Sequence, residues 1–288
     1  MCNSHNYSWL LLSIFFLNLQ GESTIQIITS VVFDVHEKWL SEEEVGARKI
    51  LTVDSLALLE QEIPTLDADT LIIFDRDDTL LQGIDMIESA HRKAFIEQWK
   101  QIYMTEKTAV EKNEFYGVMR AVKPTLIEPS APALIKKFQD AGAQVIILTR
   151  GCHGQGITGR NVADLCIDSF KAVGIDLSQS FAPFSGLMLN SSTHNGYSPL
   201  FKSGIIFSNG CDKGNSVEAF FQAIGWQPKR IIFVDDKRHY VQEVCDAAQR
   251  LKISFLGLVY TGAKKLTPPD ITLHCFKMCY LLGRDLGL

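Results

Sequence analysis

Four short apolar segments constrain the fold of this chain more than any other feature. Each is five to seven residues long and rich in Ile, Leu and Val, and helical patterns separate them: 70–74, 144–148, 230–234 and 253–259. Consecutive apolar residues leave neither face of a strand to water, which is typical of a parallel sheet covered on both faces. The alternation of strand and helix therefore predicts an α/β fold, with a Rossmann-like parallel sheet and helices on both faces.

The helices expected between these strands have recognisable ends. Pro132 suits the first turn of a helix over 131–142, and Gly142 ends it. Further helices are predicted over 53–63 (ending before Pro64), 160–173, 214–224 and 238–250. We also expect an extended segment over 25–35, and short extended pieces over 181–207 around the hairpin turn signal Asn195-Gly196.

Composition excludes several classes of protein. Of the 288 residues, 46% are hydrophobic and 21% are charged, which excludes wholesale disorder and a coiled-coil rod. A chain of this length can bury a large core without disulfides or metals. The net charge is −5, so the chain has no bulk attraction for nucleic acid or anionic lipid, and we expect no nucleic-acid partner.

The amino terminus favours export. Residues 1–21 contain no Asp, Glu, Lys or Arg, and the apolar run from Trp9 to Leu19 is shorter than the about 20 residues that a membrane span needs. This pattern is typical of a secretory signal and predicts a periplasmic or secreted protein without a stable membrane span. The alternatives are a signal-anchored protein, or a cytoplasmic one with a buried first element. Cleavage would remove Cys2 and leave six cysteines, which permits disulfides without requiring them.

Polar residues follow the predicted strands, where the ligands of α/β proteins bind. They are Asp75, Thr149 and Asp235, and the first strand is followed by Asp77 and Asp78 as well. Carboxylates this close raise one another's pKa unless a cation joins them, and Mg²⁺ is the natural cation for oxygen ligands on a loop. The simpler alternative is an acidic turn after a buried strand.

A lysine and a second acidic pair complete the set. Lys213 opens a predicted helix, where its charge and the free amides of the first turn suit an anion, although an exposed lysine there is usually only solvated. Asp235 and Asp236 end the third strand, although Asp also caps helices well. Arg150 beside Thr149 has two possible roles, contact with a substrate anion or pairing with a local acid. The order and placement of the four stretches make the combined signal strong.

These four stretches resemble the motifs of the haloacid dehalogenase (HAD) superfamily, and the resemblance spans residues 68–262. The first motif is IIFDRDDT at 72–79, the second is IILT at 146–149, the third is Lys213, and the fourth is IIFVDD at 231–236. The overall layout also resembles an uncharacterised bacterial branch of that superfamily, whose members often carry a signal peptide.

The resemblance implies phosphoryl-transfer chemistry. Asp75 is then the nucleophile that forms an aspartyl-phosphate, which splits one difficult displacement into two easier ones. Asp77 is the general acid for the leaving group and then the general base for water. Thr149 and Lys213 bind the transferred phosphoryl group. Dehalogenases of the superfamily lack an Asp at the position of Asp77, so its presence favours phosphoryl transfer over carbon–halogen cleavage.

The resemblance also implies a Mg²⁺ site. Its ligands are the side chain of Asp75, the backbone carbonyl of Asp77 and the side chain of Asp235, with Asp236 in support. The expected function is a Mg²⁺-dependent phosphomonoester hydrolase, acting on a phosphorylated small molecule or a phosphoprotein. The alternatives are a phosphotransferase or mutase, a protein phosphatase, and a non-catalytic binding protein that keeps the fold.

The sequence also predicts how the chain is divided. The HAD-like core covers 68–83 and 129–265, and a small helical cap is inserted over 84–128. The remaining predicted parts are a signal peptide over 1–21, an N-terminal extension packed on the core over 22–67 and a C-terminal segment over 266–288.

Overall fold

The computed structural model describes residues 48–82, 125–154, 161–191 and 198–265. All of them belong to one compact unit. The predicted signal peptide over 1–21, the extended segment over 25–35 and the C-terminal segment from 266 lie outside the described residues. So does the predicted cap, except for residues 125–128 at its end.

One sheet of eight strands organises the described residues, in the order β1-β8-β7-β2-β3-β6-β5-β4. The first six strands in this order run parallel to one another, whereas β5 is antiparallel to both of its neighbours, β6 and β4. The strands are β1 (Arg48–Val53), β2 (Thr70–Phe74), β3 (Gln144–Thr149), β4 (Leu187–Met188), β5 (Leu200–Lys202), β6 (Ile205–Phe207), β7 (Arg230–Asp235) and β8 (Ser254–Tyr260).

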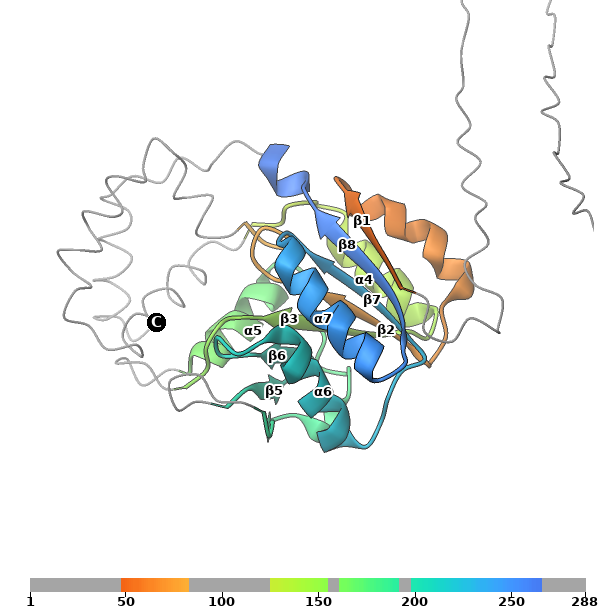
Figure 1. Cartoon of the computed structure of the whole chain (residues 1–288). Helices are drawn as coiled ribbons and strands as arrows, with labels where there is room; N and C mark the ends of the chain where they lie inside the picture. The colour runs from red at the N-terminus through yellow and green to blue at the C-terminus, as the bar shows by residue number, and fades with distance from the viewer. Residues whose placement is uncertain (1–47, 83–124, 155–160, 192–197, 266–288) are drawn as a thin grey trace, which may run out of the picture. The chain divides into compact units, whose positions relative to one another are not determined.

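Helices cover both faces of the sheet (Figure 1). They are α4 (Ala131–Asp140), α5 (Val162–Ala172), α6 (Lys213–Ile224) and α7 (Arg238–Arg250), with 3-10 helices η1 (Leu56–Thr65), η2 (Ala182–Phe184) and η3 (Gly262–Lys265). Helices α6 and α7 pack together on one face, while α4 and α5 lie on the other. The predicted α/β fold with helices on both faces of the sheet is confirmed, and the predicted parallel sheet gains antiparallel pairings at one edge.

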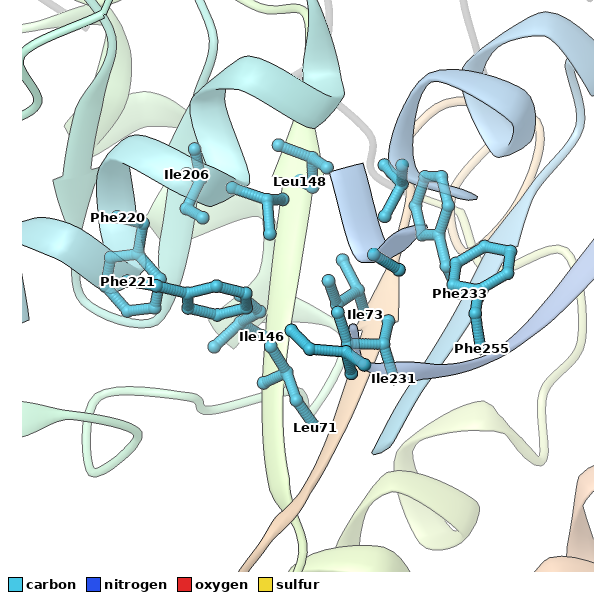
Figure 2. Close-up of a cluster of buried hydrophobic side chains, with 14 of the residues drawn as sticks. Leu71, Ile73, Ile146, Leu148, Ile206, Phe220, Phe221, Ile231, Phe233 and Phe255 are labelled. Atoms are coloured by element: carbon cyan, nitrogen blue, oxygen red, sulfur yellow. The ribbon is translucent and has the colours of Figure 1, made fainter. Parts of the chain in front are cut away.

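The central strands are buried on both faces, as the apolar segments predicted. Leu71 and Ile73 of β2 point into the core under α6 and α7, together with residues of β3, β7 and β8 (Figure 2). Phe74 lies on the opposite face, where its ring stacks on that of Phe138 from α4 with centroids 6.4 Å apart. All five residues of β2 are buried, so this strand is fixed in the middle of the sheet.

The structure differs from the sequence prediction before β2. The helix predicted over 53–63 is wrong, because β1 extends to Val53 and the following element is the 3-10 helix η1. Ser55 sets the start of η1, since its hydroxyl accepts a hydrogen bond of 3.2 Å from the amide of Ala57. Pro64 lies inside the last turn of η1 and does not end it.

A tight hairpin joins β5 to β6, inside the stretch over 181–207 where short extended pieces are predicted. Its two turn residues, Ser203 and Gly204, both have positive φ angles of 49° and 78°, as a two-residue hairpin of this hand requires. A Cβ atom on Gly204 would lie 2.4 Å from the carbonyl oxygen of Leu177, so only glycine fits there. The turn predicted at Asn195-Gly196 lies outside the described residues. Within the described ranges, every helix is too short or too polar to span a bilayer.

Candidate active site

Strand register brings two predicted site residues to the same level of the sheet. Phe74 of β2 pairs with Val234 of β7, so Asp75 and Asp235 follow side by side at the carboxyl edge. The amide of Asp75 donates a hydrogen bond of 2.8 Å to the carbonyl oxygen of Val234, which extends the ladder to the site itself. Thr149 ends the neighbouring strand β3 at the same edge.

Lys213 joins these two aspartates. Its Nζ atom lies 2.5 Å from Oδ1 of Asp75 and 2.6 Å from Oδ2 of Asp235. The lysine side chain and that of Asp235 are fully buried, and that of Asp75 is 10% exposed. A buried cation between two buried carboxylates balances much of the charge that desolvation would otherwise make costly.

The start of helix α6 is what delivers Lys213. Asp212 caps the helix by accepting a hydrogen bond of 2.8 Å from the amide of Asn215. Gly214 allows α6 to approach α7 closely, because a Cβ atom there would lie 2.1 Å from the carbonyl oxygen of Glu243. Glu243 in turn accepts a hydrogen bond of 2.8 Å from the amide of Lys213. The lysine is therefore held by backbone contacts as well as by its charge.

Two aromatic rings complete the surroundings of the lysine. Its Nζ atom lies 4.8 Å from the ring centroid of Tyr240 and 5.5 Å from that of Phe233, both within the range of cation–π attraction. Burial by itself would lower the pKa of the Lys213 ammonium, but the charges of Asp75 and Asp235 outweigh burial and raise that pKa. The two carboxylates thus favour the charged form of the lysine.

Burial dominates the electrostatics of Asp75. It raises the pKa of this carboxyl group well above its ordinary value, the negative charges of Asp235 and Asp77 raise it further, and Lys213 opposes them. Burial also raises the pKa of Asp236, against the lowering effect of Lys237, whose ammonium lies 2.5 Å away. An additional cation nearby would lower the pKa of both carboxyl groups.

The carboxylates offer a place for such a cation. Oxygen atoms of Asp75, Asp235 and Asp236 all lie within 4.8 Å of one another. Asp235 already accepts hydrogen bonds from Lys213 and from the amide of Lys237, but each carboxylate oxygen has more than one lone pair. Hard oxygen donors of this kind suit Mg²⁺, so the residues present fit the predicted ion. Three of the four predicted metal-site residues therefore meet through their side chains.

The side chain of Asp77 is not part of this carboxylate cluster and pairs with Arg76 instead. Its Oδ1 atom is 2.6 Å from Nη1 of Arg76, and 27% of the side chain is exposed. The loop around it is tightly closed, since the carbonyl oxygen of Arg76 accepts hydrogen bonds from Leu80 (3.2 Å) and Leu81 (2.9 Å). Asp78 adopts the left-handed region with φ 59°, which turns the chain back. This loop fixes the backbone of Asp77 beside Asp75.

Thr149 is buried at the end of β3, and its hydroxyl accepts a hydrogen bond of 3.0 Å from the amide of Gly151. Its carbonyl oxygen accepts one of 2.8 Å from the amide of Ser208, which ties the loop after β3 to the loop after β6. Arg150 points toward α7, where its guanidinium lies 4.0 Å from Glu243 and 5.2 Å from the ring centroid of Tyr240, and it donates a hydrogen bond to the carbonyl oxygen of Gly210. Of its two predicted roles, the structure supports pairing with a local acid.

Unsatisfied polar atoms gather at this edge of the sheet. Within the described ranges, four buried side-chain atoms make no hydrogen bond to the protein: Nε of Arg76, Oγ1 of Thr79, Oγ of Ser208 and Nδ2 of Asn209. All four belong to the loops after β2 and β6. Buried polar groups are ordinarily paired, so these atoms mark a place where water or a ligand supplies partners.

Sequence reasoning missed three residues of this site. Arg76 lies inside the first motif, and its signal in the sequence was a cation between two acids, Asp75 and Asp77. Tyr240 and Glu243 lie three residues apart on α7, which places them on one face of that helix toward Lys213. Nothing in their spacing alone distinguishes that face from any other polar helix face.

The fold and the site together define the class of this protein. It is an α/β protein with a buried lysine–carboxylate cluster at the carboxyl edge of its sheet. Residues 52–278 match the family described as a protein of unknown function, DUF2608, and the chain belongs to this family. A relative from Chlamydia trachomatis, named "Putative outer membrane protein", is 24% identical over 78% of this chain and 83% of its own. A relative of the same name from Chlamydia muridarum is 25% identical over 86% of this chain and 89% of its own.

Among solved structures, the HAD domain of the effector protein Lem4 from Legionella pneumophila, an inactive mutant, aligns with a TM-score of 0.38. It is 13% identical, and the alignment covers 77% of this chain and 96% of that domain.

Proposed function

We propose that this protein is a Mg²⁺-dependent phosphomonoester hydrolase of the HAD type that works through an aspartyl-phosphate on Asp75. One observation carries the proposal, the bridge from Lys213 to Asp75 and Asp235. These residues are 138 and 22 positions from the lysine in sequence, and the fold brings them within 2.6 Å of its ammonium. A buried cation beside a carboxylate at the carboxyl edge of a parallel sheet suits transfer of a dianionic phosphoryl group.

The residues at the edge divide the chemistry between them. The carboxylate of Asp75 attacks phosphorus, and the bond from phosphorus to the leaving oxygen breaks as Asp77 gives that oxygen a proton. Water then attacks phosphorus, the bond to Asp75 breaks, and Asp77 takes a proton from the water. Lys213 and Thr149 hold the phosphoryl oxygens on which negative charge develops.

Asp75, Asp235 and Asp236 would hold Mg²⁺, with the backbone carbonyl of Asp77 as a further ligand. The ion, when bound, neutralises charge on the phosphoryl oxygens and relieves the repulsion among the three carboxylates. The raised pKa values of Asp75 and Asp236 support this assignment, because they express a local excess of negative charge and burial.

The order of the four motifs supports the HAD assignment. The motif stretches end β2, end β3, open α6 and end β7, in that sequence. A non-catalytic binding protein has no need of Asp77 in addition to Asp75, so the pair favours an enzyme. The substrate is a phosphorylated small molecule or a phosphoprotein.

We further propose that the protein is exported. The uncharged, apolar stretch within residues 1–21 is the main support, and the names of the chlamydial relatives agree with it. Fractionation of cells that express the chain with a C-terminal tag tests this proposal. Recovery of the tagged protein in the cytoplasmic fraction at full precursor mass would count against export.

Hydrolysis of p-nitrophenyl phosphate by the purified full chain tests the proposed reaction. We expect turnover with Mg²⁺, none with EDTA, and loss of at least about a hundredfold in Asp75→Asn. Asp176→Asn is the matched control, because Asp176 lies in a surface turn where it accepts a hydrogen bond from the amide of Ser178. Turnover that survives in Asp75→Asn, or an inactive wild type that is correctly folded, would refute the proposal.

A further inference from the structure

Arg76 is a buried arginine inside the first motif, and it connects that motif to helix α5. Its side chain is 2% exposed. One guanidinium nitrogen, Nη1, lies 2.6 Å from Oδ1 of Asp77, and the other, Nη2, lies 3.2 Å from Oγ of Ser169. The guanidinium also lies over the ring of Phe170, 5.9 Å from its centroid. The planar fork therefore has a separate partner at each tip and an aromatic face beside it.

Ser169 is prepared for this contact. Its hydroxyl donates a hydrogen bond of 2.6 Å to the carbonyl oxygen of Cys166, one turn earlier in α5. Because a hydroxyl has one proton, the oxygen of Ser169 is left as an acceptor toward Arg76. The orientation of the guanidinium is thus set from α5, an element that contributes no other residue to the proposed chemistry.

The backbone of Arg76 is fixed independently of its side chain. Its carbonyl oxygen accepts the amides of Leu80 and Leu81, and Asp78 donates to the carbonyl oxygen of Leu81 at 2.8 Å. Loss of the guanidinium would therefore leave the loop closed and change mainly what holds the Asp77 carboxylate. Burying the charged guanidinium costs free energy of desolvation, and a loop with a purely structural role does not need a buried ion that is hydrogen-bonded through both terminal nitrogens.

We propose that Arg76 is a positioning residue that holds the carboxyl group of Asp77 in place for both proton transfers of the reaction. This inference rests on the proposed function. In the first half-reaction Asp77 donates a proton to the leaving oxygen, and in the second it accepts one from the attacking water. A side chain that is 27% exposed has room to rotate, and Arg76, fixed by Ser169, limits that rotation.

The choice of substrate distinguishes the two half-reactions experimentally. p-Nitrophenolate leaves without a proton, so its release does not need Asp77, but hydrolysis of the aspartyl-phosphate does. A simple alkyl phosphate needs Asp77 in both steps. Loosening Asp77 should therefore make the phosphoenzyme accumulate with the aryl substrate and lower the rate without such accumulation with the alkyl substrate. A merely structural defect would lower both rates alike.

The test uses Arg76→Lys and Ser169→Ala in the full chain. Lysine keeps the charge but cannot reach both partners, and Ser169→Ala removes one anchor without touching the motif. For Arg76→Lys we expect steady-state turnover of p-nitrophenyl phosphate to fall about 10- to 100-fold. The phosphorylated fraction of this variant, measured by mass spectrometry after acid quench, should rise above that of the wild type. Ser169→Ala should show the same pattern to a smaller extent, and Arg76→Lys should add nothing in an Asp77→Asn background.

Arg230→Lys is the matched control. Arg230 also pairs with a carboxylate and a hydroxyl, those of Glu62 and Thr65, at the amino end of β7. We expect its phosphorylated fraction to equal that of the wild type. An equal loss on both substrates with an unchanged phosphorylated fraction, or no change in either variant, would overturn the role of Arg76 while leaving the proposed function intact. A wild type without turnover would instead refute the proposed function, and this inference with it.

Discussion

The ammonium of Lys213 lies 2.5 Å from the carboxylate of Asp75, and neither side chain is more than one-tenth exposed. Asp235 completes the contact at 2.6 Å. Removing the lysine leaves two carboxylates in a buried place with no cation between them. Contacts of this kind are strongly destabilising to break from one side, even where the intact pair contributes little net stability.

Lys213→Met should therefore lower the free energy of unfolding by about 3–5 kcal/mol, measured by urea denaturation in EDTA. Adding Asp235→Asn to that variant should recover part of the loss, because the two changes share one interaction. Lys136→Met is the control, since Lys136 and Asp140 form an exposed pair on α4. A midpoint for Lys213→Met that equals the control's would contradict the prediction.

Asp75→Asn should stabilise the protein when metal is absent. Burial raises the pKa of Asp75 above its ordinary 3.8, so the stability it confers is fully present below that pH and is lost as the carboxyl group ionises at higher pH. At neutral pH the asparagine avoids this cost, and Lys213 keeps Asp235 as a charged partner, so no buried ion is left alone. We expect a gain of about 0.5–2 kcal/mol in EDTA. Thermal unfolding of both proteins measures it; a variant less stable than the wild type would contradict it.

Mg²⁺ should reverse that order. At a hundredfold excess over its dissociation constant, the ion should stabilise the wild type by about 2.7 kcal/mol, which is roughly 5–10 °C in Tm for a chain of this size. Asp75→Asn should gain much less, because it lacks one ligand. Asp176→Asn should respond as the wild type does. A Tm that does not depend on Mg²⁺ in any of the three would argue against the ion site.

Tyr260 should make stability fall at alkaline pH. Its hydroxyl donates a hydrogen bond of 2.8 Å to Glu128, and burial, with Glu128, raises its pKa above the ordinary value of 10.0. The raised pKa means that the contribution is fully present below about pH 10 and is lost above it, because the unfolded chain ionises first.

Tyr260→Phe should cost about 1.5–3 kcal/mol near pH 8 and lose less stability than the wild type between about pH 8 and about pH 11. Urea midpoints at the two pH values measure both effects, and ionisations common to the two proteins cancel in the comparison. Equal pH slopes would show that Tyr260 is not protected in the folded state.

Gly214→Ala should be severely destabilising. The added methyl group would lie 2.1 Å from the carbonyl oxygen of Glu243, a backbone atom of α7 that cannot move without its helix. We expect a loss of more than about 3 kcal/mol. Gly225→Ala is the comparison, because Gly225 has φ 65° but nothing within 4 Å of its Cβ position, and it should cost only about 1–2 kcal/mol. Similar losses at both positions would contradict the prediction.

The central strands could be predicted from sequence because their burial is visible in it. β2 and β7 are apolar at consecutive positions, and only a strand covered on both faces keeps all of them from water. β1 could not be predicted in the same way. It is an edge strand that begins with Arg48 and Lys49, and its residues are largely half-buried. Its place depends on the partner strand β8 rather than on its own pattern.

The candidate site, too, could be predicted from the sequence only in part. The Asp75, Lys213 and Asp235 cluster was foreseeable, because each residue lies at the end of a strand or the start of a helix that the sequence already indicated. The contacts of Arg76 were not, since they depend on where Ser169 of α5 lies, 93 positions away. Side-chain direction at such distances is set by packing, which no local pattern records.

The pairing of β1 with β8 also determines when the sheet can be completed during synthesis. Arg48 lies opposite Phe255, so 207 further residues (255 less 48) must leave the ribosome before the first strand meets its partner. At roughly 5–20 residues per second that delay is about 10–40 s. Throughout it the nascent chain holds an unpaired strand near its amino end. Until β8 has been made, the residues of β1 therefore have no neighbouring strand in this sheet with which to pair.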